Sequence, residues 1–178
     1  MSVRAIASAG LDVTETLAAA SSPASSVDGV SNTRRYNAYN QLNKTLQSST
    51  TPVADTVVDM SFTLAGASTT IDLTAVPSAA DVDVDVDLTG KKLVALLISA
   101  DADNAAGGVT MESGAANGYD FLGDAAYGLT LYPGMTVNLF QLGAAAGLPA
   151  VAAGDKTIDF AGTAGDVIEC LAVFGTQA

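Results

Sequence analysis

The segment 81–99 constrains the fold of this chain most, because its first half alternates strictly between acidic and apolar residues. Aspartate occupies every second position, at Asp81, Asp83, Asp85 and Asp87, and a valine or leucine follows each one. Successive side chains of a β-strand point to opposite faces. The alternation therefore predicts a strand with an apolar wall on one face and a ladder of carboxylates on the other.

The second half of the segment predicts another strand. A Thr-Gly-Lys-Lys turn sequence at 89–92 separates it from the first. Leu93–Ile98 is apolar at every position, which suits a central strand covered from both sides or a strand at an interface. A helix is the rival interpretation of so short an apolar run. The lysines before it and the Asp- and Asn-rich stretch after Ala100 favour the strand.

From Thr56 onward the chain predicts about eight or nine short strands, at the spacing of a sandwich or barrel. Besides the two above, the clearest are Val57–Leu64, Thr69–Leu73, Val109–Glu112, Lys156–Phe160 and Val167–Phe174. We predict an all-β protein: a single antiparallel β-sandwich, jelly-roll-like, with an extended N-terminal arm. The apolar runs Leu93–Ile98 and Val167–Phe174 are expected to form its core.

Two shorter patterns refine this prediction. Pro133-Gly134 fits the central positions of a type II turn and predicts a hairpin of Leu129–Leu131 with Thr136–Gln141. The sequences TIDLTA at 70–75 and TIDFAG at 157–162 resemble each other, and we interpret them as two equivalent strand ends.

Residues 1–51 differ from the rest and are predicted to be an arm used in assembly, with the sandwich at 52–178. Their first part is rich in Ala, Ser and Gly and is too poor in apolar surface to fold alone. In residues 32–50, Tyr36, Tyr39, Leu42 and Leu46 fit a helix, whereas alternate positions also fit a strand. The sequence leaves this choice open, with a slight preference for an extended tether.

Charge is spread unevenly along a chain whose net charge is −12. Residues 1–50 hold four basic and three acidic residues, and residues 51–178 hold three basic and sixteen acidic residues. Phosphate binding needs clustered Lys and Arg, so nucleic acid and anionic membranes are not expected partners. The arm is instead expected to dock on an acidic neighbour, including the body of another copy.

Residue types exclude several chemistries. The chain has no histidine and one cysteine, Cys170, which excludes the usual zinc sites, the Ser-His-Asp and Cys-His nucleophile systems and any intrachain disulfide. The apolar core that a secretory signal needs is interrupted by Gly10, Asp12 and Glu15. The sequence also contains no uncharged apolar run that approaches about 20 residues, the length needed to span a bilayer. We expect no enzyme activity, no cofactor, no metal and no catalytic residue.

Three groups of residues nevertheless resemble sites. The carboxylates of the 81–87 ladder would lie about 6.5–7 Å apart, too far to share one calcium ion easily. Val86 and Lys92 stand where an EF-hand needs Gly and Glu, so a solvated or subunit-facing strand is favoured. The loop Asp101–Asn104 fits a cation site less well than a turn. The aromatic residues are either a glycan-stacking patch or loop anchors, and the anchors are favoured: Tyr119, Phe121, Tyr127 and Tyr132.

A series of short motifs resembles small β-sandwich virion proteins of tailed bacteriophages and prophages. It covers about residues 52–176 and consists of TIDLTAVP (70–77), VDLTGKKLVALLIS (86–99), NAAGGVTM (104–111), GAANGYDFLG (114–123), LTLYPGMTVNLF (129–140) and DKTIDFAGTAGDVIECLAVFG (155–175). The resemblance implies a virion component without catalytic residues.

The expected function is therefore that of a structural virion protein, capsid-associated as a decoration or minor capsid protein. It would assemble in many copies through the arm, with itself and other virion proteins, such as the major capsid protein, as partners. The alternative is a fibre- or tail-associated module or a carbohydrate-binding module of the same fold. The sequence leaves the part of the virion, the copy number and the symmetry open.

Overall fold

The structure is a computed structural model that describes residues 4–17, 32–47, 49–77, 85–120, 122, 126–140 and 149–176. Within these ranges the chain forms β-strands and no helix. It divides into two compact units, one of Ile6–Lys44 and one of Met1–Ala5 with Thr45–Ala178. Each unit is described by itself below.

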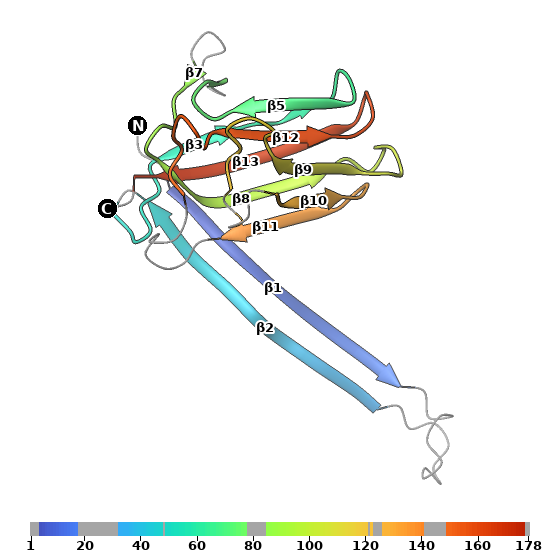
Figure 1. Cartoon of the computed structure of the whole chain (residues 1–178). Helices are drawn as coiled ribbons and strands as arrows, with labels where there is room; N and C mark the ends of the chain where they lie inside the picture. The colour runs from blue at the N-terminus through green and yellow to red at the C-terminus, as the bar shows by residue number, and fades with distance from the viewer. Residues whose placement is uncertain are drawn as a thin grey trace. The chain divides into compact units, whose positions relative to one another are not determined.

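The larger unit is an antiparallel β-sandwich of two sheets, seen as two layers in Figure 1. The first sheet has the order β11-β8-β13-β3, with β4 continuing beside β13. The second has the order β10-β9-β12-β5. The strands of the first sheet are β3 (Thr56–Asp59), β4 (Phe62–Thr63), β8 (Lys92–Ala100), β11 (Thr136–Phe140) and β13 (Val167–Gly175). Those of the second are β5 (Ser68–Asp72), β9 (Val109–Ser113), β10 (Gly128–Leu131) and β12 (Thr157–Ala161).

The strand order is that of a jelly roll. When β3 and β4 are counted as one strand, and the short pair β6 (Val76–Pro77) and β7 (Asp85–Val86) is left out, the two sheets hold strands 1-8-3-6 and 2-7-4-5 in chain order. This is the arrangement in which two Greek keys fold over each other. The connections β4–β5, β8–β9, β10–β11 and β12–β13 gather at one end of the sandwich (Figure 1). The prediction of an antiparallel, jelly-roll-like sandwich is confirmed.

The core lies between the sheets and is built by the alternate positions that point inward. On β8 and β13 the buried residues include Leu96, Ile98, Ile168, Cys170 and Ala172. The opposing sheet contributes Met111, Leu131, Ile158 and Phe160. Burial of apolar surface contributes roughly 25 cal/mol per Å², so this contact supplies most of the driving force for folding. The two apolar runs predicted to form the core do so, except that Leu97 and Leu171 point outward.

The predicted strand Val57–Leu64 is interrupted in the middle. Its inward residues Val58, Met60 and Leu64 are buried, as expected. At Ser61, however, the side-chain hydroxyl accepts a hydrogen bond from the Cys170 N–H at 3.1 Å and donates to Asp59. The Ser61 hydroxyl thus takes the place of a backbone acceptor for the Cys170 N–H. This break in the backbone ladder separates β3 from β4.

The prediction of a hairpin around Pro133-Gly134 is wrong, although the predicted type II turn is confirmed. Gly134 has a φ of 76°, and the Met135 N–H donates to the Tyr132 carbonyl at 2.9 Å, as in a type II turn. The flanking strands β10 and β11 belong to different sheets, so the turn connects the two layers. The related segments around Ile71 and Ile158, in contrast, are direct neighbours, because these two residues face each other in the β5–β12 ladder.

The smaller unit is a two-stranded sheet of β1 (Arg4–Leu17) and β2 (Asn32–Gln47), which run antiparallel (Figure 1). Residues 32–47 are therefore extended, which decides between the two conformations that the sequence left open. The strands hold 14 and 16 residues, whereas strands of globular proteins usually hold about 3–10. An isolated two-stranded sheet is only marginally stable in water, so this unit needs a partner surface.

A tight corner follows β9 and depends on two glycines. A methyl group on Gly118 would overlap the Ser113 hydroxyl and the backbone of Gly114. The corner also places the Asn117 carbonyl where it accepts hydrogen bonds from the N–H groups of Lys156 and Thr157, at 2.7 and 2.9 Å. These contacts fix the long β9–β10 connection to the start of β12.

We expect the Gly118→Ala variant to be destabilised by about 2 kcal/mol, because the added methyl group meets backbone that cannot move freely. Urea denaturation followed by circular dichroism measures this loss. Gly66→Ala is the matched control, since no atom lies within 4 Å of a methyl group there. Equal stability of the two variants would contradict the close packing of this corner.

Candidate functional site

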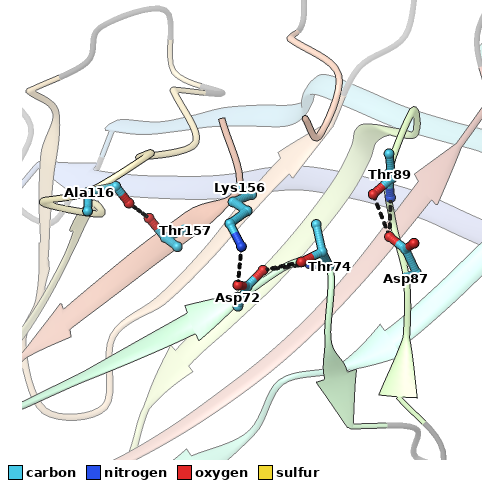
Figure 2. Close-up of polar contacts among 7 residues, drawn as sticks. All are labelled: Asp72, Thr74, Asp87, Thr89, Ala116, Lys156 and Thr157. Atoms are coloured by element: carbon cyan, nitrogen blue, oxygen red, sulfur yellow. Dashed lines mark hydrogen bonds and ion pairs between the residues drawn. The ribbon is translucent and has the colours of Figure 1, made fainter. Parts of the chain in front are cut away.

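The aspartate ladder is only partly a strand. Residues 78–84, with Asp81 and Asp83, lie outside the described residues. Asp85 belongs to the short strand β7 (Asp85–Val86), which pairs with β6 (Val76–Pro77). Asp87 leaves the strand: its carboxylate accepts from the N–H and hydroxyl of Thr89 at 2.8 and 2.6 Å (Figure 2). The prediction of one continuous strand through residue 88 is wrong, because Asp87 starts the turn.

Two ion pairs connect the strands near this region. Lys156 Nζ contacts the Asp72 carboxylate at 2.5 Å, and the same carboxylate accepts from the Thr74 hydroxyl (Figure 2). Lys91 Nζ lies 2.7 Å from Asp55, which also accepts from the Thr176 N–H. Burial raises the pKa of both carboxyls, but the hydrogen bonds from the lysines and neighbouring groups outweigh it and lower each pKa to about 2. Both lysines therefore stabilise the fold.

The Asp101–Asn104 loop is a brace between two connections of the sandwich. The Asn104 side chain donates to the Val167 carbonyl at 2.8 Å and accepts from the Val167 N–H at 2.7 Å. Asp166 is buried, and its two carboxylate oxygens accept from the N–H groups of Ala105 and Thr163, both at 2.7 Å. Asn104 belongs to the candidate cation site, but both polar atoms of its side chain are thus hydrogen-bonded to the backbone of Val167, at the start of β13.

Metal-ligating residues do not cluster in the part of the chain that the structure describes. No group of three or more His, Cys, Asp or Glu side chains there is placed to hold an ion. One acidic pair does interact: the Asp120 N–H donates to the Asp155 carboxylate at 3.2 Å. Burial and the neighbouring Asp120 raise the pKa of Asp155. This contact joins the β9–β10 connection to the turn before β12.

The three tyrosines that the structure describes among the candidate aromatic residues do not share one exposed surface. Tyr119 is fully buried, and its hydroxyl donates to the Pro149 carbonyl at 3.0 Å and accepts from the Leu93 N–H at 3.1 Å. Burial raises its pKa to about 12. Tyr127 is also buried, Phe121 lies outside the described residues, and Tyr132 is 58% exposed in the β10–β11 turn. Tyr119 is a loop anchor, as the favoured interpretation expected.

The outer side of the first sheet has the character of an interaction surface. Val57, Leu97 and Leu171 point away from the core and are 42%, 42% and 43% exposed. Leu171 is the direct cross-strand neighbour of both Leu97 and Asp59, which places these side chains together on β13, β8 and β3. We call these three exposed residues, Val57, Leu97 and Leu171, the apolar face. Leu97 and Leu171 also line an open depression of about 450 Å³, together with Asp59, Ser61, Ser99, Glu169 and Cys170.

The outer side of the second sheet is different. There the cross-strand neighbours are Thr70 with Asp159, Asp159 with Glu112, and Thr110 with Thr130. The Thr70 hydroxyl donates to the Asp159 carboxylate, and the hydroxyls of Thr110 and Thr130 lie 2.9 Å apart. Among the described residues, the outer side of the first sheet is thus the more apolar of the two and the better suited to a protein partner.

Comparison with family models, curated proteins and solved structures found no match to this chain. Its fold and sites are therefore described from its own residues alone. Among the described residues, no helix has the length and apolar character needed to cross a membrane.

The apolar face and the buried Asp166 were not singled out as sites from the sequence. Leu97 stands within a uniformly apolar run, which carries no alternation that would mark it as outward-facing, although the sequence did allow an interface for Leu93–Ile98. For Leu171 a second signal was available: the charged residue Glu169 stands two positions before it and therefore on the same face of the strand. Asp166 follows Gly165 in a turn sequence, where an aspartate is ordinarily solvated.

We expect the Asp166→Ala variant to lose about 3 kcal/mol, because two N–H groups in a buried position lose their charged acceptor. Chemical denaturation measures the change, and Asp103→Ala in the exposed part of the same loop is the control. If the two variants were equally stable, Asp166 would not brace the loops.

Stability should also depend on pH through Asp55 and Asp72. Because their pKa is about 2 in the folded chain and 3.8 ordinarily, their contribution is complete above about pH 4. It is lost as the pH falls toward 2. Between these values, the melting temperature of the native chain should fall by about 2–4 °C more than that of the Asp55→Asn/Asp72→Asn variant, since exposed pairs contribute about 1 kcal/mol or less. Parallel melting curves would contradict this.

Proposed function

We propose that this chain is a structural, capsid-associated virion protein that assembles in multiple copies through the antiparallel pair of β1 and β2, the N-terminal hairpin. One observation carries the proposal: a jelly-roll sandwich is joined to a separate two-stranded unit whose strands hold 14 and 16 residues. A compact domain gains nothing from such a unit by itself, because the unit is too thin to bury a core. It gains a function when the strands lie against another subunit.

The fold supports the same class of function by analogy. Jelly rolls occur in viral capsid proteins, and also in lectins and cupins. Fold alone does not decide among these, so the site must. Of the tyrosines considered for glycan stacking, Tyr119 and Tyr127 are buried and only Tyr132 is exposed, which does not favour a lectin. In contrast, the apolar face favours contact with protein, and the motif resemblance supports a virion component.

Charge supports attachment between copies. Residues 51–178 carry sixteen acidic residues against three lysines. Two of those lysines, Lys91 and Lys156, are already paired with aspartates of the same sandwich. The segment 32–47 contributes three basic residues and no acidic one. A positive strand and an acidic sandwich attract each other, and in one chain type this attraction favours assembly of many copies.

We expect deletion of residues 1–44 to convert an oligomer into a monomer. The deletion keeps Leu46, which is fully buried in the larger unit. Light scattering after size-exclusion chromatography measures the mass, and negative-stain microscopy shows whether rings, fibres or shells form. Thermal melting verifies that the shortened chain folds.

A full-length variant serves as a second test. Arg34→Glu/Arg35→Glu keeps the length of the hairpin and reverses part of its charge. We expect it to weaken assembly in low salt. If both the shortened chain and this variant assembled like the native chain, the hairpin would not be the assembly element. A native chain that stays monomeric alone and with capsid protein would contradict the proposed function itself.

A further inference from the structure

The apolar face is the most informative surface that the fold leaves without an explanation. Leu97 and Leu171 lie opposite each other on the two central strands of the first sheet, where a soluble sandwich usually presents polar residues. Glu169 and Asp59 lie next to them and line the same depression. The surface is thus apolar at its centre and acidic at its border.

The chemistry of this border defines the partner. Of the residues that line the depression, two are acidic and none is Lys or Arg. A partner that buries Leu97 and Leu171 must therefore also supply positive charge, because unpaired carboxylates are costly to bury. An apolar segment that carries several Arg or Lys residues satisfies both requirements.

The chain itself contains one segment of this kind. In sequence, β2 has Arg34, Arg35 and Lys44 with no acidic residue, and it also has Tyr36, Tyr39 and Leu42. Aromatic residues and arginine are the types most enriched at protein interfaces. In contrast, β1 carries Asp12 and Glu15 and only one basic residue, Arg4. The complementary strand is therefore β2.

We propose that the apolar face of one copy receives β2 of the hairpin of a second copy. This inference rests on the proposed function and specifies the surface through which the hairpin acts. The side chains of Leu97 and Leu171 pack against the apolar residues of the incoming strand. Its arginines pair with Glu169 and Asp59 at the border.

A symmetric contact between two apolar faces fits less well. In a two-fold contact both copies use the same surface, so each would bring its Asp59 and Glu169 into one shared interface. Four carboxylates would then be brought together, and the lining residues of the depression provide no cation to balance them. Such like-charge contacts reduce affinity.

The contact between copies can be mapped directly. A photo-crosslinking amino acid replaces Leu171, and equal amounts of light and nitrogen-15-labelled full-length chains are mixed, allowed to exchange and irradiated. Mass spectrometry then identifies the crosslinked peptides. We expect crosslinks from position 171 to residues 32–47 that combine light and heavy chains. Crosslinks only within one copy, or only to the sandwich of another copy, would overturn the inference.

Substitutions test the energetics. We expect Leu171→Glu to weaken self-association at least about tenfold, because it adds a charge at the centre of the contact. Ser68→Glu adds the same charge at an exposed position of the second sheet and should leave self-association unchanged. Glu169→Arg should weaken association about threefold, and combination with Arg35→Glu should restore most of the loss. Sedimentation analysis measures each constant, and melting curves verify folding.

The outcomes separate this inference from the proposed function. If deletion of residues 1–44 abolishes assembly but Leu171→Glu assembles as tightly as the native chain, the hairpin docks elsewhere and the inference is wrong. If the native full-length chain does not assemble at all, both are wrong. Loss of assembly with Leu171→Glu, its retention with Ser68→Glu and rescue by the charge exchange would establish the contact.

Discussion

The pairing of β8 with β13 is the interaction on which the rest of the sandwich depends. The two strands are the longest of the larger unit, with nine residues each, and they lie in the middle of the first sheet. Their register runs from Ile168 opposite Ala100 to Gly175 opposite Lys92, with one irregularity after Val173. On one side they provide the core, and on the other they present Leu97 and Leu171. A single pairing thus determines both the buried and the exposed apolar surface.

The sequence predicted the strands well and their partners poorly, for physical reasons. Alternation and turn residues are local, so they located most strands of the sandwich to within a residue or two. The type II turn at Pro133-Gly134 was correct, but a turn of that geometry does not state whether the flanking strands pair or cross to the other layer. The misassigned hairpin follows from this limit. Jelly-roll order arises from contacts between residues far apart in sequence, such as Ile71 with Ile158.

The polar contacts show the same division. The loop residues at 101–104 were correctly expected to form a turn, but their link to Val167 and the burial of Asp166 depend on two connections meeting at one end of the sandwich. In the same way, composition showed a near-neutral arm before an acidic body, whereas the apolar face became visible only when Leu171 and Leu97 were found side by side. Charge balance is a property of the sequence, and a surface is a property of the fold.

The position of β13 has a consequence for how the chain is made. β13 follows both of its neighbours, β3 and β8, in the chain and lies between them in the sheet, so neither can complete its pairing before β13 has been synthesised. The hairpin, in contrast, pairs β1 with β2, and both of these strands precede the sandwich in the chain. During translation the proposed assembly element is therefore made before the surface proposed to receive it is complete. A copy can receive a hairpin at Leu171 only after its own β13 has paired with β8, which delays its linkage to other copies in the proposed contact.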